Sequence, residues 1–115
     1  MSDTIIYKIS PRQAWEMAQR AGVFTGAPID VADGFIHFST AEQAQETLDK
    51  HFVGQDDLVL AAVNVSSLGD ALKWEVSRGG ALFPHLYGDL SMTHVIWTRP
   101  ITTASDGTHT MPDLT

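Results

Sequence analysis

The sequence LVLAAVNV, residues 58–65, is almost continuously apolar. Neighbouring side chains of a strand point to opposite faces, so a strand with apolar residues at successive positions is covered on both faces. We therefore predict that this stretch is a strand at the centre of a sheet. Residues 72–77 follow as an alternation of apolar and polar side chains. That pattern is typical of a strand with one face in the core and the other in solvent.

Two helices are predicted before the central strand. Ser10 is a residue type that favours the N-cap position, and the helix that it begins would end at Gly22. Ser39 would cap the second helix, with Glu42 three residues later as its capping-box partner. That second helix would end at Gly54.

Further strands are predicted at residues 4–9, 35–38 and 93–98. Residues 23–34 contain two glycines and a proline and are expected to form an irregular loop. Pro84 is expected to break the chain between two strands. One strand–helix–strand–helix run followed by several strands indicates the α+β class.

Length and composition limit the kind of protein. The chain has 115 residues, no cysteine, and 14 acidic against 7 basic residues, for a net charge of −7. We expect one α+β domain over residues 1–100 and a polar tail over 101–115. The missing cysteine excludes thiol chemistry and disulfides. The scattered cations argue against a nucleic-acid groove, and the absence of a long apolar run argues for a cytoplasmic protein without a membrane span. The oligomeric state stays open.

The first candidate site lies in GFIHFST, residues 34–40. On a strand, Ile36 and Phe38 would point to the core face, and His37 and Ser39 to the other face. A helix predicted to start there offers free N–H groups that suit a phosphate or a carboxylate. The alternative is that Ser39 only caps the helix and that His37 is an ordinary residue on the sheet surface.

Two further stretches carry polar side chains suited to a site. Glu75 projects away from Trp74, and its carboxylate could bind a sugar hydroxyl or act as an acid or base. His85 and Tyr87, in LFPHLYG at residues 82–88, would share one side and line a small-molecule pocket. The alternatives are a solvated strand face and a turn whose aromatic residues pack in the core. No spacing of histidines and acids typical of zinc ligands occurs, and we expect no metal.

The strings GFIHFST and LFPHLYG, with LKWE between them, closely resemble a bacterial family known as domain of unknown function 952. The resemblance runs from about residue 5 to residue 98. That family is in turn similar in fold to the ADP-ribosyltransferase-like superfamily. Members of this superfamily have a small split, mostly antiparallel β-sandwich with short helices, and they bind NAD between the halves of the sheet.

Within that superfamily, the start of the chain looks like the RNA 2′-phosphotransferases. His37 matches a histidine of their second motif, but Lys8 stands where an earlier histidine is expected. The resemblance implies that Lys8 holds a phosphate, that Tyr87 stacks on a base and that Glu75 is the catalytic glutamate. Glu75 precedes Tyr87, however, which reverses the order that is usual in the superfamily.

The resemblance implies a protein that binds NAD or an ADP-ribose derivative, with ADP-ribosyl or phosphoribosyl transfer as its chemistry. A non-catalytic small-molecule binding module and a protein-interaction domain remain as alternatives. The expected site residues are Glu75 and His37 in catalysis, and Lys8, Ser39, His85 and Tyr87 in ligand binding.

Overall fold

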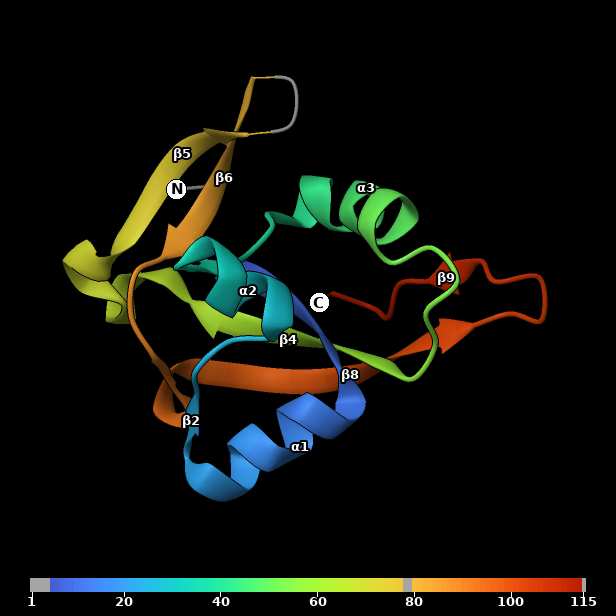
Figure 1. Cartoon of the computed structure of the whole chain (residues 1–115), viewed down its shortest axis with the longest axis horizontal. Coiled ribbons are helices and arrows are strands. Elements are labelled where there is room, and N and C mark those ends of the chain that lie inside the picture. The colour runs from blue at the N-terminus through green and yellow to red at the C-terminus, as the bar shows by residue number, and fades with distance from the viewer. Residues whose placement is uncertain (1–4, 78–79, 115) are drawn as a thin grey trace.

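The strand pairings of the computed structural model are all antiparallel over the residues that the structure describes, 5–77 and 80–114. With two main helices, this confirms an α+β protein built on antiparallel sheets (Figure 1). Thr4, the first residue of the first predicted strand, lies outside the described residues.

Three sheets make up the strand structure. One has the order β1-β4-β8-β9, the second β3-β6-β5, and the third pairs β2 with β7. The bounds are β1 (Ile5–Pro11), β2 (Val23–Phe24), β3 (Ile36–His37), β4 (Leu58–Asn64), β5 (Leu72–Ser77), β6 (Ala81–Leu86), β7 (Leu90–Ser91), β8 (Val95–Thr103) and β9 (His109–Thr110).

Within the described part of the chain, three α-helices and three short 3₁₀ turns connect the strands. In Figure 1, α1 and α3 lie on opposite sides of β4 and β8. The bounds are α1 (Arg12–Ala21), α2 (Pro28–Asp33), α3 (Ala41–His51), η1 (Val65–Ser67), η2 (Gly69–Ala71) and η3 (Met92–His94). None of these helices is long and apolar enough to cross a membrane.

The predicted central strand is confirmed as β4, which has a partner strand on each side. Its side chains alternate between two cores. Val59 and its alternate neighbours pack with Trp15 of α1, and Leu60 and its neighbours pack with Leu48 of α3. Burial on both faces explains why this strand carries an unbroken apolar run.

The predicted start of the first helix is wrong. β1 runs on to Pro11, and α1 begins at Arg12 without a side-chain cap. Ser10 belongs to the strand and is fully buried, and its hydroxyl donates to the carbonyl oxygen of Pro11 at 3.0 Å. Pairing of this part of β1 with β4 outweighs the local preference of serine for a cap.

The second helix is capped by Thr40 and not by Ser39. The Thr40 hydroxyl accepts from the N–H of Gln43 at 3.3 Å, and the Gln43 side chain accepts from the N–H of Thr40 at 3.1 Å. Ser39 is held one residue earlier in extended backbone, because its N–H and carbonyl both pair with Tyr7. The capping box is therefore present, but shifted by one residue from the predicted position.

Residues 23–34, predicted to be an irregular loop, contain β2 and α2. Pro28 occupies the first turn of α2, where its missing N–H costs nothing. Gly34 ends the helix with a φ of 86°, a conformation that glycine adopts without strain. The residues that suggested a break instead mark the two ends of a helix.

The second half of the chain differs from the prediction in two places. Pro84 does not break the chain but lies inside β6, where its carbonyl accepts from the N–H of Phe38 at 3.0 Å. Residues from 101 on were expected to form a polar tail. The first of them continue β8 to Thr103, and the chain then returns as β9, which pairs with β8. Ile101 is buried in the core beside Leu58.

Candidate functional site

A cavity of about 520 Å³ opens between β1, α2 and the C-terminal part of α3. This volume is within the range of roughly 300–1,000 Å³ that is usual for small-molecule sites. Of the six residues predicted for the site, Lys8, His37 and Ser39 line the cavity. Glu75, His85 and Tyr87 do not line it.

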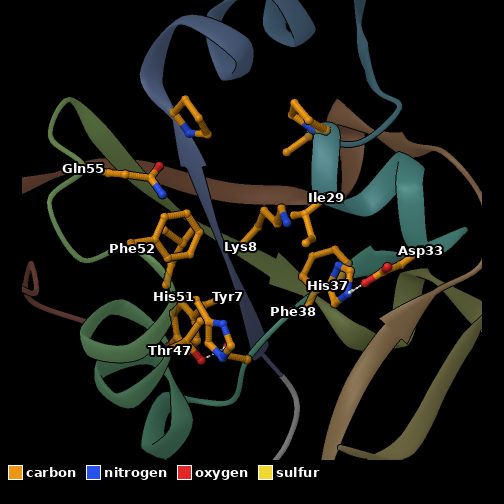
Figure 2. A pocket seen from close by; sticks show the side chains of 15 residues that line it. Tyr7, Lys8, Ile29, Asp33, His37, Phe38, Thr47, His51, Phe52 and Gln55 are labelled. Atoms are coloured by element: carbon orange, nitrogen blue, oxygen red, sulfur yellow. Dashed lines mark hydrogen bonds and ion pairs between the residues drawn. The ribbon is translucent and has the colours of Figure 1, made fainter. Parts of the chain in front are cut away.

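The cavity has two different walls, with Lys8 between them (Figure 2). One wall carries the aromatic rings of Tyr7 and Phe52, together with the side chain of Thr47. The other carries Ile29, Asp33, His37 and Phe38. A flat aromatic ligand would therefore meet aromatic rings on one side, and on the other a mixed wall in which Asp33 and His37 supply the polar groups.

Lys8 is buried at 3 % exposure and forms an ion pair with Asp30 of α2. Its Nζ lies 2.9 Å from Oδ2 and 3.1 Å from Oδ1 of Asp30. Asp30 is buried as well, at 2 % exposure. Two buried charges are tolerable in a protein interior only when they are paired and hydrogen-bonded in this way.

Asp30 is the centre of a network of hydrogen bonds. It accepts from the N–H of Ala27 at 2.8 Å and of His37 at 3.0 Å, and it lies 2.6 Å from Nδ1 of His37. Burial alone would raise the pKa of Asp30, but the His37 hydrogen bonds and the Lys8 charge outweigh it and lower the pKa to about 2. Asp30 therefore stays ionised at neutral pH and ties β1, α2 and β3 together.

His37 has both of its ring nitrogens beside carboxylates. Nδ1 faces Asp30, and Nε2 lies 2.9 Å from Oδ2 of Asp33 (Figure 2). The side chain remains about one quarter exposed, on the cavity wall. Its orientation is thus set from both ends.

Ser39 lines the cavity next to Thr47. The two hydroxyl oxygens lie 2.9 Å apart, and the Thr47 hydroxyl donates to the carbonyl of Gln43 at 3.0 Å. Because threonine has one hydroxyl proton, Ser39 is the donor to Thr47. Ser39 is therefore already engaged within the protein.

Glu75, His85 and Tyr87 converge at a separate place, on one face of the β3-β6-β5 sheet. Oε1 of Glu75 accepts from the Tyr87 hydroxyl at 2.8 Å and lies 2.8 Å from Nδ1 of His85. Phe35 stacks on His85, with 4.1 Å between ring centroids. We call Phe35, Glu75, His85 and Tyr87 the aromatic–carboxylate cluster.

Hydrogen bonding shifts the pKa values of the cluster. The contacts from His85 first, and from Tyr87 second, hold the pKa of Glu75 below its usual value. The Glu75 carboxylate in turn raises the pKa of the Tyr87 phenol. Both shifts favour an ionised glutamate that accepts from a neutral tyrosine.

His37 connects the two places. It pairs with His85 across β3 and β6, and their ring centroids are 5.5 Å apart. The six predicted residues thus divide into a group in the cavity and a group on the sheet face, with His37 at the boundary. Among the described residues, no group of three or more histidine and acidic side chains is placed to hold a metal ion.

Sequence reasoning missed Asp30, Asp33 and the aromatic wall of the cavity. Both aspartates lie in the stretch predicted to be a loop. A helix beginning at Pro28 would have placed Asp30 in its first turn, where acidic residues are favoured. Tyr7 was within a predicted strand, and nothing local distinguishes it from a core residue.

Comparison with known proteins shows close relatives of this chain. A family described as protein of unknown function (DUF952) matches residues 9–98. The crystal structure of protein CC0527 from Caulobacter crescentus has 50 % sequence identity and a TM-score of 0.88, over 93 % of this chain and 94 % of that chain. A crystal structure of a double mutant of CC0527 gives the same values.

The solution NMR structure of CC0527 has 52 % identity and a TM-score of 0.80, over 90 % of each chain. A search of curated proteins found no match. The matched residues run from Ile9 within β1 to Thr98 within β8. They include the cavity residues of α2, β3 and α3 and the aromatic–carboxylate cluster, whereas Tyr7 and Lys8 lie just before them. The chain therefore belongs to the family of unknown function DUF952.

Proposed function

We propose that the chain binds a nucleotide-type small molecule, with NAD or an ADP-ribose derivative as the ligand class, in the cavity beside Lys8. The observation that carries the proposal is the pair of unlike walls. Tyr7 and Phe52 offer apolar rings for a base, and Asp33 offers a carboxylate that can accept from ribose hydroxyls.

The resemblance to the ADP-ribosyltransferase-like superfamily supports NAD among the nucleotides. Antiparallel sheets with two main helices are compatible with that fold. This support is an analogy of fold and of sequence motif. A binding experiment tests the ligand class directly.

Transfer chemistry is a second candidate function, favoured by the position of His37 between the cavity and the aromatic–carboxylate cluster. When nicotinamide leaves NAD, positive charge develops on the ribose. Because Glu75 lies outside the cavity, this chemistry requires the ribose to extend past His37 to the aromatic–carboxylate cluster, where an ionised Glu75 would stabilise that charge. Water would then form the bond to the ribose carbon, giving ADP-ribose, nicotinamide and a proton. The expected observation is release of nicotinamide, at a rate that Glu75→Gln lowers.

Binding is tested by calorimetric titration with NAD, ADP-ribose and nicotinamide, using two matched variants of α2. Ile29 and Val31 are both exposed apolar side chains of this helix, but only Ile29 lines the cavity. We expect Ile29→Gln to weaken binding by about fivefold, because apolar contact with the ligand is lost. Val31→Gln should leave the affinity unchanged.

Each result has a clear meaning. Saturable binding that only Ile29→Gln weakens places the ligand in the cavity. Binding without release of nicotinamide makes the protein a non-catalytic binding module. If none of the three compounds binds, the proposed function is wrong, and a protein-interaction role becomes the better hypothesis.

A further inference from the structure

We infer that the cavity takes a phosphate-free group, such as a base with its ribose, and that a phosphate on the ligand adds no affinity. This inference rests on the proposed function and specifies which part of the ligand enters. The lysine at this cavity and the first N–H groups of the helices around it are already occupied by the protein itself.

Lys8 is the first such feature. Among the described residues that line the cavity, it is the one lysine or arginine. Its ammonium group is in contact with both oxygens of Asp30, and its side chain is only 4 % exposed. A phosphate would have to displace a buried carboxylate that three further hydrogen bonds hold in place.

The helix starts at the cavity are the second feature. At α2, the N–H of Ala27 donates to Asp30, and Pro28 has no N–H. At α3, Thr40 and Gln43 satisfy each other's backbone N–H groups in the capping box. At α1, the N-cap residue Pro11 lines the cavity and has no N–H, and the N–H of Arg12 donates to the carbonyl oxygen of Asp57 at 2.8 Å. None of the three helices therefore presents these N–H groups to an anion.

The exposed side chain at the rim is an acid. The Asp33 side chain is 45 % exposed and contacts Nε2 of His37 at 2.9 Å. An anion entering beside His37 would therefore approach the Asp33 carboxylate. The chain as a whole carries a net charge of −7, which adds to the repulsion of an anionic ligand.

The same groups suit a neutral or cationic ring with hydroxyl groups. Asp33 can accept hydrogen bonds from a ribose diol, and Tyr7 and Phe52 can contact the faces of the base. A dinucleotide such as NAD would bind through one base–ribose end, with its diphosphate outside the cavity in solvent.

The test compares pairs of ligands that differ by one phosphate, titrated at equal ionic strength. The pairs are adenosine with adenosine monophosphate, and nicotinamide riboside with nicotinamide mononucleotide. For the unmodified protein we expect the phosphorylated member of each pair to bind no more tightly than the nucleoside.

The variant Asp33→Asn removes the carboxylate charge from an exposed site. It should improve binding of the phosphorylated member, relative to its nucleoside, by about fivefold, since one repulsive charge at close range is lost. Asp70→Asn is the charge-matched control, because Asp70 lies in η2 and does not line the cavity. This control should leave the ratio unchanged.

Tighter binding of the phosphorylated member by more than about twofold, or binding of NAD without binding of either nucleoside, would overturn the inference but leave the proposed function standing. An unchanged ratio in Asp33→Asn would also overturn it, because the rim charge would then have no effect. If neither the nucleosides nor NAD binds, the proposed function and the inference both fail.

Discussion

Asp30 is the residue on which the polar wall of the cavity depends. Replacing it with asparagine leaves the Lys8 ammonium group buried without a counter-charge. We expect Asp30→Asn to lower the free energy of unfolding by about 3–5 kcal/mol, as is usual when one partner of a buried ion pair is removed. Urea denaturation measures this change.

A double variant separates the energy of the Lys8–Asp30 ion pair from the effects of each residue's other contacts. Lys8→Met combined with Asp30→Asn removes both charges, and should be less destabilised than the sum of the two single variants. A loss of less than about 1 kcal/mol for Asp30→Asn alone would show that the ion pair is not formed in solution.

The lowered pKa of Asp30 predicts a pH dependence. A carboxyl group whose pKa is lower in the folded chain stabilises that chain fully above its ordinary pKa of about 4. This contribution is lost as the pH falls toward about 2, the pKa of Asp30 in the folded protein. Urea denaturation between pH 5 and pH 2 should show a stability that falls with pH, and the slope should be smaller in Asp30→Asn. Equal slopes would contradict the assignment.

Tyr87→Phe tests the aromatic–carboxylate cluster. Loss of the phenol removes one of the two side-chain donors to Oε1 of Glu75. We therefore expect the pKa of the Glu75 carboxyl to rise toward its usual value, as followed by carbon-detected NMR of the side chain. An unchanged pKa would show that the hydroxyl does not contact Glu75 in solution.

At this scale the sequence identifies side chains by type and alternation. Glu75, His85 and Tyr87 lie together, but apart from the cavity that Lys8 and Ser39 line, a division that the sequence did not predict. It did not identify Asp30. The contact of Asp30 with Lys8 joins residues 22 positions apart, and it exists only once α2 packs against β1. Pairings of this kind depend on the tertiary fold and leave no local pattern.

At the scale of elements, the Thr40 N-cap of α3 can be tested directly by substitution. Thr40→Ala removes the hydroxyl that accepts from Gln43, and should cost about 1 kcal/mol of stability in urea denaturation. Glu42→Gln, at the position predicted from the sequence as the capping-box partner, should change stability by less than about 0.5 kcal/mol. A larger effect of Glu42→Gln than of Thr40→Ala would mean that the helix begins elsewhere.

The continuous apolar run located β4, and the alternation of apolar and polar side chains located β5. The beginnings of the helices were less predictable. Ser10 and Ser39 both have the residue type of a cap, but strand pairing holds each of them in extended backbone. α2 was missed because it is only six residues long, too short for a periodic pattern to appear.

At the scale of the whole molecule, the fold separates residues that the sequence analysis had placed in one site. β1, α2 and α3 surround the cavity, while the β3-β6-β5 sheet carries the aromatic–carboxylate cluster on its face. His37 belongs to both because β3 lies between them. That division follows from which strands pair, and strand order is not contained in the local pattern of any one segment.

The most direct test of the account is a two-dimensional NMR titration of ¹⁵N-labelled protein with NAD. We expect saturable chemical-shift changes of backbone amides on the cavity walls, at Lys8, Ile29, Asp33 and Phe52. The amides of β9 should be unchanged. A flat response, or shifts confined to Glu75 and Tyr87 without any on the cavity walls, would contradict the claim that the cavity is the ligand site.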